Sequence, residues 1–209
     1  MKTFLIAILT LVSVYTAQAA EPFRGTLTFN VSGPEARELK TLSLVGNGKL
    51  MRLDVLMQEN TISVIRDPET KVLTMMVPQR KMAMTISETK GMGNIGIGGE
   101  ESGEPTVTVS TEVVKILGYD THLETLVFPN GNKVQAWISD ELGVFSIPDA
   151  FAGAMKKWVN KKAVPLRVVK WVNGAETVRL EATAATTDMP APSLFVVPAD
   201  FQTVAMPTK

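Results

Sequence analysis

The chain contains no cysteine and only one histidine, His122, among its 209 residues. Without cysteine it can form no disulfide, no thiolate nucleophile, and no zinc or iron–sulfur site built on sulfur. An excess of charge of either sign is also absent, because 21 basic and 21 acidic residues cancel. A neutral chain has no surplus of cations to neutralise phosphates, so we expect no nucleic-acid partner.

Long apolar runs are missing too, apart from one near the N-terminus. Lys2 precedes the apolar stretch from Phe4 to Tyr15, and Ala17-Gln18-Ala19 follows it. This order is typical of a secretory signal peptide and predicts residues 1–19 as the signal, with cleavage after Ala19. No later run reaches the roughly 18 apolar residues that a membrane-spanning helix needs. We therefore expect a soluble protein exported to a bacterial periplasm, with residues 20–209 as a single domain.

Short stretches of alternating polar and apolar residues dominate the rest of the chain. Residues 26–31 alternate in this way, and residues 51–57 repeat the pattern. Turn signals such as Gly46-Asn47-Gly48 and Asn173-Gly174 separate the stretches at hairpin spacing. About ten short strands result, which is typical of a meandering antiparallel sheet or barrel. The tail after Pro190 is expected to run extended, anchored by Phe195, Val197 and Phe201.

One segment has helical rather than strand periodicity. From Pro148 to Lys161 the apolar residues share one helical face, and they are Phe151, Met155, Trp158 and Val159. A lone amphipathic helix among strands must bury that face, so we expect it to pack on the sheet. Its lysine-rich polar face leaves an alternative, an interfacial helix that makes transient contact with a membrane surface.

The segment from Gly91 to Gly96 matches the dinucleotide fingerprint G-x-G-x-x-G. That fingerprint works where its glycines end a strand and open a helix. The following residues, 98–103, cannot form this helix and add negative charge. We expect a flexible hairpin loop over residues 91–104 rather than a nucleotide site.

His122 and Glu124 are predicted to share a strand face, and such a pair can carry out acid–base chemistry. The sequence has no G-x-S-x-G nucleophile motif, no H-E-x-x-H motif and no second histidine. A solvated strand face is therefore the favoured interpretation. We expect no enzyme, no catalytic residue, no resident metal and no cofactor.

Methionine is abundant, with 11 residues including Met1. Thioethers can fill a core, and they can also line a surface that adapts to varied apolar ligands. A third interpretation is a soft-metal site, because thioethers select Cu(I). The residues considered for copper are Met75, Met82, Met84 and His122.

Six short motifs follow one another along the chain: Gly48–Asp54, Asp67–Lys71, Met75–Met82, Ile116–Tyr119, Trp137–Gly143 and Val197–Phe201. Together they resemble a methionine-rich family of exported bacterial proteins called domain of unknown function 4412. That family is similar to the Lol-type lipoprotein carriers and receptors. The resemblance implies an incomplete antiparallel β-barrel, or half-barrel, with a helix covering its apolar concave face. In the carrier relatives this face shields acyl chains.

The resemblance and the missing catalytic motifs together predict a non-enzymatic binding or carrier protein for an apolar ligand. The ligand would be a lipid, an acyl chain or a lipidated partner. The residues expected to line its cavity are Met51, Leu53, Met82, Met84, Trp137, Phe151 and Trp158. Two alternatives stay open, a periplasmic copper-binding protein and a structural or stress protein without a ligand. The sequence predicts no oligomeric state.

Overall fold

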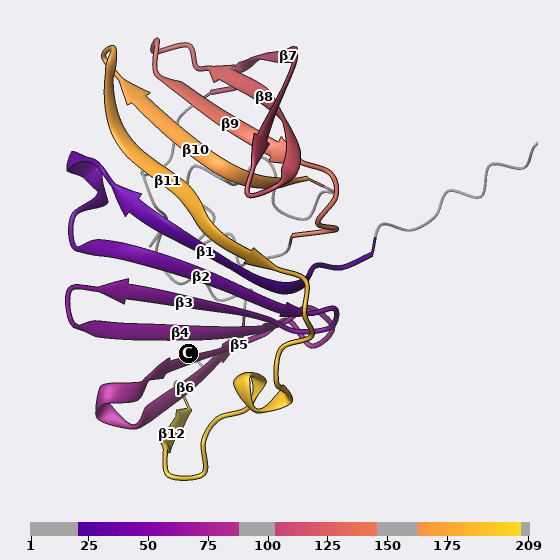
Figure 1. Cartoon of the computed structure of the whole chain (residues 1–209). Coiled ribbons are helices and arrows are strands. Elements are labelled where there is room, and N and C mark those ends of the chain that lie inside the picture. Colours follow the sequence, from indigo (N-terminus) through magenta and orange to yellow (C-terminus); the bar gives the residue numbers. More distant parts are fainter. Residues whose placement is uncertain (1–20, 88–102, 146–162, 206–209) are drawn as a thin grey trace, which may run out of the picture.

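A computed structural model describes residues 21–87, 103–145 and 163–205. In these ranges the chain forms a twelve-stranded sheet with the order β12-β6-β5-β4-β3-β2-β1-β11-β10-β9-β8-β7 (Figure 1). The strands are β1 (Arg24–Ser32), β2 (Leu39–Asn47), β3 (Met51–Met57), β4 (Asn60–Asp67), β5 (Val72–Val77), β6 (Met82–Ser87), β7 (Thr106–Ile116), β8 (Tyr119–Val127), β9 (Lys133–Ser139), β10 (Val164–Val172), β11 (Ala175–Thr186) and β12 (Gln202–Ala205). Three short 3₁₀ helices, η1 (Pro34–Ala36), η2 (Pro78–Arg80) and η5 (Pro192–Phe195), lie between strands.

The sheet consists of two antiparallel meanders joined in its centre. Strands β2 to β6 form one meander, β7 to β11 form the other, and β1 lies between β2 and β11. The short β12 pairs with β6 in parallel. Figure 1 shows that β7–β10 lie at an angle to β2–β6, and the sheet order leaves β7 and β12 at two separate edges. The prediction of a mainly β, unclosed fold is therefore confirmed.

Three predictions from the sequence lie wholly or mainly outside the described residues. They are the signal peptide over residues 1–19, the helix expected from Pro148 to Lys161, and the glycine-rich loop, of which only Gly103 and Glu104 are described.

Hairpin turns form where the sequence predicts them. Gly48 has a φ of 85°, and the Asn47 side-chain oxygen accepts hydrogen bonds from the backbone N–H groups of Lys49 and Leu50 at 2.9 and 2.7 Å. Asn173 and Gly174 both have positive φ angles, 51° and 80°. Such angles suit the tight turns whose twist matches that of the flanking strands.

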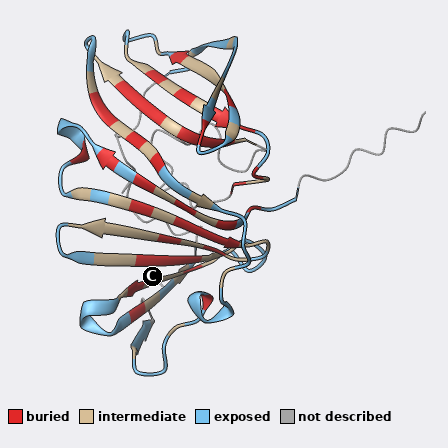
Figure 2. Cartoon of the chain, in the orientation of Figure 1, coloured by how far each residue is buried: buried red, intermediate tan, exposed pale blue. Residues whose placement is uncertain are grey.

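One face of the sheet carries the main hydrophobic core, and we call it the core face (Figure 2). On β1 the predicted alternation is confirmed, because Leu27, Phe29 and Val31 are buried. Thr28 is half-buried and Asn30 exposed on the opposite face, which we call the outer face. The buried residues in Figure 2 concentrate on the central strands of the sheet. The core is therefore formed by neighbouring strands burying every second side chain.

The C-terminal tail packs on the outer face of β4–β6. Val197 and Phe201 contact a small second cluster of buried residues, Ile65, Met76 and Ala83. Phe195 is buried as well. The three predicted anchors are therefore confirmed, but the tail is not extended throughout, because Pro192–Phe195 form the 3₁₀ helix η5. The structure adds a pairing that the sequence did not predict, since the tail ends in β12 beside β6.

Candidate functional site

A continuous apolar row crosses the core face from β2 to β12. Neighbouring members are cross-strand register partners, and residues directly opposite each other point to the same face. In strand order the row consists of Leu44, Leu53, Val64, Met75, Met84 and Val204.

The exposure of this row rises toward the edge of the sheet. Leu44, Leu53 and Val64 are at most 2% exposed. Met75 and Met84 are half-buried, and Val204 at the edge is 46% exposed. Met82, two residues before Met84 on the same face, is 41% exposed. The apolar core face is thus closed over the central strands and open at its β6–β12 end.

The structure brings together four of the seven side chains predicted to line a cavity. Met51 and Leu53 belong to the main core, and Met82 and Met84 continue its face toward the edge. Trp137 does not join them. By strand alternation it lies on the outer face, because its neighbours Ala136 and Ile138 point into the core, and its half-buried side chain also packs against members of the main core.

The ring of Trp137 instead contacts a cation. The guanidinium carbon of Arg167 lies 5.1 Å from the centre of the ring, within the range of a cation–π contact. The other two predicted lining residues, Phe151 and Trp158, lie outside the described residues.

His122 and Glu124 do share a strand face, but it is not the solvated one that the sequence favoured. Their register partners on β9 are Ile138 and Ala136, which are fully buried members of the core. The two side chains are 30% and 19% exposed, and His122 Nε2 lies 3.8 Å from Glu124 Oε1. The register with β9 decides this placement, because polar residues occupy both faces of β8.

A buried cation on the core face was missed by the sequence analysis. Lys170 is 6% exposed, and its register partner Val178 belongs to the core. Its Nζ lies 3.4 Å from Glu35 Oε2 on η1. A buried ammonium needs such a partner, since desolvation otherwise costs several kcal/mol. The available signal was a lysine at an apolar position of an alternating strand.

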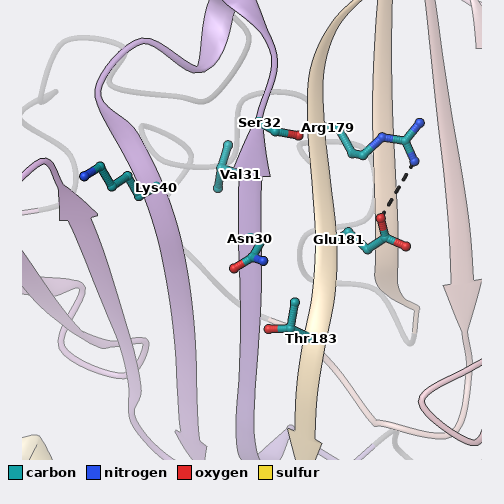
Figure 3. Close-up of a pocket in the computed structure, with 7 residues that line it drawn as sticks. All are labelled: Asn30, Val31, Ser32, Lys40, Arg179, Glu181 and Thr183. Carbon is teal, nitrogen blue, oxygen red and sulfur yellow. Dashed lines mark ion pairs between the residues drawn. The ribbon is translucent and has the colours of Figure 1, made fainter.

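A hollow of about 470 Å³, lined mostly by polar residues, lies where β1, β2 and β11 meet (Figure 3). Its lining residues are Asn30, Val31, Ser32, Lys40, Arg179, Glu181 and Thr183. Glu181 accepts hydrogen bonds from Arg167. Arg179 binds both oxygens of Glu176 at 2.8 and 2.7 Å and lowers the pKa of that carboxyl group. The acidic and arginine side chains around the hollow therefore pair with one another.

The described ranges contain neither a metal-binding cluster nor a membrane-spanning helix. No three acidic or histidine side chains there gather in a way that could hold a metal ion. Within the same ranges, no helix combines the length and the apolar character needed to cross a membrane.

Several solved structures are similar to this chain in fold. An uncharacterized conserved protein from Thermus thermophilus shares 12% identity at a TM-score of 0.51, and the match covers 87% of this chain and 90% of that one. A structure of PNGF-II shares 14% identity at a TM-score of 0.47, with 87% of this chain covered. This chain spans only 30% of the length of PNGF-II.

The MucA/MucB complex structure from Pseudomonas aeruginosa shares 8% identity at a TM-score of 0.43, and the match covers 89% of this chain and 59% of that one.

Comparison of the sequence with known families identifies the family of this chain. No curated protein matches the chain. The sequence model of one family matches residues 23–201, which include every described strand except β12. The chain therefore belongs to the family described as Domain of unknown function (DUF4412).

Proposed function

We propose that this protein is a non-enzymatic carrier of the bacterial periplasm that binds an apolar ligand at the open end of its core face. The ligand would be a lipid, an acyl chain or the acyl group of a lipidated protein. The observation that carries the proposal is the apolar row, which continues from buried Leu53 to half-buried Met84 and exposed Val204.

Burial alone can supply the binding energy. Each methylene removed from water contributes about 0.8 kcal/mol, so an acyl chain needs no polar anchor. Met75, Met82 and Met84 suit such a ligand, because unbranched thioether side chains adapt to varied apolar shapes. The proposal requires neither a nucleophile nor a proton donor.

The test is native mass spectrometry of the protein purified from its own periplasm, with lipid extraction of the same sample. We expect a bound mass that is lost on denaturation and recovered in the lipid extract. A delipidated sample should regain that mass when it is incubated with the extracted lipid. A clean apo mass that stays unchanged after this incubation would contradict the proposal.

A copper-binding function is the second candidate, and it is favoured by the placement of three methionines on one face. Met75 and Met84 are direct cross-strand partners, and Met82 shares their face. Thioethers in such proximity are a soft ligand set that Cu(I) prefers. Anaerobic titration with Cu(I) distinguishes the two functions, because a carrier of apolar ligands gains no tight stoichiometric copper binding.

A further inference from the structure

We infer that the C-terminal strand β12 is part of the ligand-binding face, with Val204 as a ligand-contacting residue. The inference rests on the proposed function, because it assigns a further residue to the same apolar surface. It also makes the tail from Pro192 to Ala205, which we call the strap, a component of the site.

The register of β12 places Val204 on the core face. It pairs with Met84, and Met84 pairs with Met75. The preceding residue, Thr203, pairs with Ala83, which is buried in the outer-face cluster. Because side chains alternate along a strand, Val204 and Thr203 point to opposite faces of the same edge.

The part of the strap that precedes β12 is held on the outer face by side-chain contacts. Val197 and Phe201 pack on the outer-face cluster. Arg52 Nη1 donates a hydrogen bond to the Leu194 carbonyl at 2.7 Å, and Lys81 Nζ lies 2.9 Å from Asp200 Oδ2.

β12 is attached through its backbone, which pairs with β6 and includes a hydrogen bond from the Gln202 N–H to the Lys81 carbonyl at 2.8 Å. Gln202, Thr203 and Val204 are all exposed, and the strand contains only four residues. A short exposed edge strand of this kind opens at low free-energy cost. β12 can therefore open from the β6 edge while the rest of the strap stays attached to the outer face.

A ligand that touches Val204 binds better when β12 is paired with β6 than when β12 is open. Thermodynamic linkage then requires that ligand binding stabilises this pairing and that the pairing strengthens binding. Phe201, on the outer face, becomes a positioning residue for a ligand that it does not touch. Such coupling is expected if the strap is part of the binding site, and it is not expected if the strap only covers the edge of the sheet.

The first experiment compares Val204→Asp with the matched control Thr203→Asp, using the apolar dye N-phenyl-1-naphthylamine. Each variant adds one charge to the same strand, but on opposite faces. We expect dye affinity to fall about tenfold or more for Val204→Asp, since loss of one buried valine contact is worth about that factor. Thr203→Asp should stay within about twofold of the wild type.

The second experiment addresses coupling and guards against release of β12 by the added charge. Hydrogen exchange of residues 195–205 should slow in the wild type when the dye is bound. Phe201→Ala should weaken dye binding as well, whereas an edge cover without a role in binding would leave the affinity unchanged.

The outcomes separate the two proposals. Wild-type dye uptake with an unchanged Val204→Asp variant, or with no added protection of the strap, overturns this inference and leaves the proposed function standing. A wild-type protein that takes up neither dye nor lipid overturns the proposed function, and the inference falls with it.

Discussion

Met84 of β6 lies directly opposite Met75 of β5 on the core face. The pair marks the boundary between the closed core and the open edge, because Val64 on one side is 1% exposed and Val204 on the other is 46% exposed. The flexible thioether side chains of Met75 and Met84 therefore lie where the apolar face changes from buried core to solvent-accessible surface. This position is the one that a ligand-adapting side chain would occupy.

Charges placed at this boundary should abolish binding of an apolar ligand. We expect the double variant Met82→Asp with Met84→Asp to lose dye and lipid uptake by more than about tenfold, because the ligand would have to desolvate two carboxylates. The measurement is fluorescence titration with N-phenyl-1-naphthylamine, checked by circular dichroism for folding. The double variant Thr85→Asp with Thr203→Asp adds the same charge on the outer face and should bind normally. A folded Met variant with wild-type uptake would show that the ligand does not use this surface.

Copper should bind weakly if the protein is a carrier of apolar ligands. We expect anaerobic Cu(I) titration, in competition with a chromogenic chelator, to show no tight one-to-one complex. The methionine-to-leucine variants Met75→Leu and Met84→Leu keep the volume of the apolar surface and remove the sulfur. Dye uptake should survive these variants. Tight copper binding that they abolish would favour the second candidate function.

Gly46 should tolerate no side chain, because it lies where three elements of the core meet. A Cβ atom there would stand 2.5 Å from the Phe23 carbonyl oxygen, 2.7 Å from its ring and 2.9 Å from the Met51 sulfur. We expect Gly46→Ala to lower the free energy of unfolding by about 1–3 kcal/mol, as overpacking commonly does. Urea denaturation measures the loss.

A comparison for this substitution lies in an exposed turn. Gly131 has a φ of 83° and open space around its Cβ position, so Gly131→Ala should cost about 1–2 kcal/mol through backbone strain alone, without steric overlap. If the Gly46→Ala variant were as stable as the wild type, the close packing of Phe23 and Met51 around residue 46 would be wrong.

The ion pair between Glu176 and Arg179 should make stability depend on acid pH. Hydrogen bonding from Arg179 lowers the pKa of Glu176 below 4.5, its ordinary value. The pair therefore stabilises the folded state at pH values above the ordinary pKa. This stabilisation is lost as the pH falls through the lowered pKa of the folded state.

We expect thermal unfolding of the wild type to show a steeper fall in stability in this acid range than Glu176→Gln does. The difference should stay below about 1 kcal/mol, because both side chains are about one-third exposed. Arg179→Ala should flatten the profile in the same way. Parallel pH profiles for all three proteins would contradict the prediction.

Local patterns in the sequence were enough to predict most strands and their turns. The alternating residues 26–31 and 51–57 lie in β1 and β3. The predicted tail anchors Val197 and Phe201 pack on the sheet. These features succeed because they depend on neighbouring residues. A strand period and a turn residue act within a few positions of the chain.

Only the tertiary structure decided which strands from distant parts of the chain meet and which faces look inward. The sequence predicts that Trp137 lines the same cavity as Met51 and Leu53, yet Trp137 lies on the opposite face of the sheet. His122 likewise lies on the core face because β8 pairs with β9 in one particular register. The sequence did not predict the pairing of β12 with β6 either. Alternation specifies two faces for each strand separately, whereas long-range pairing and the burial of the whole sheet select the face that becomes the core.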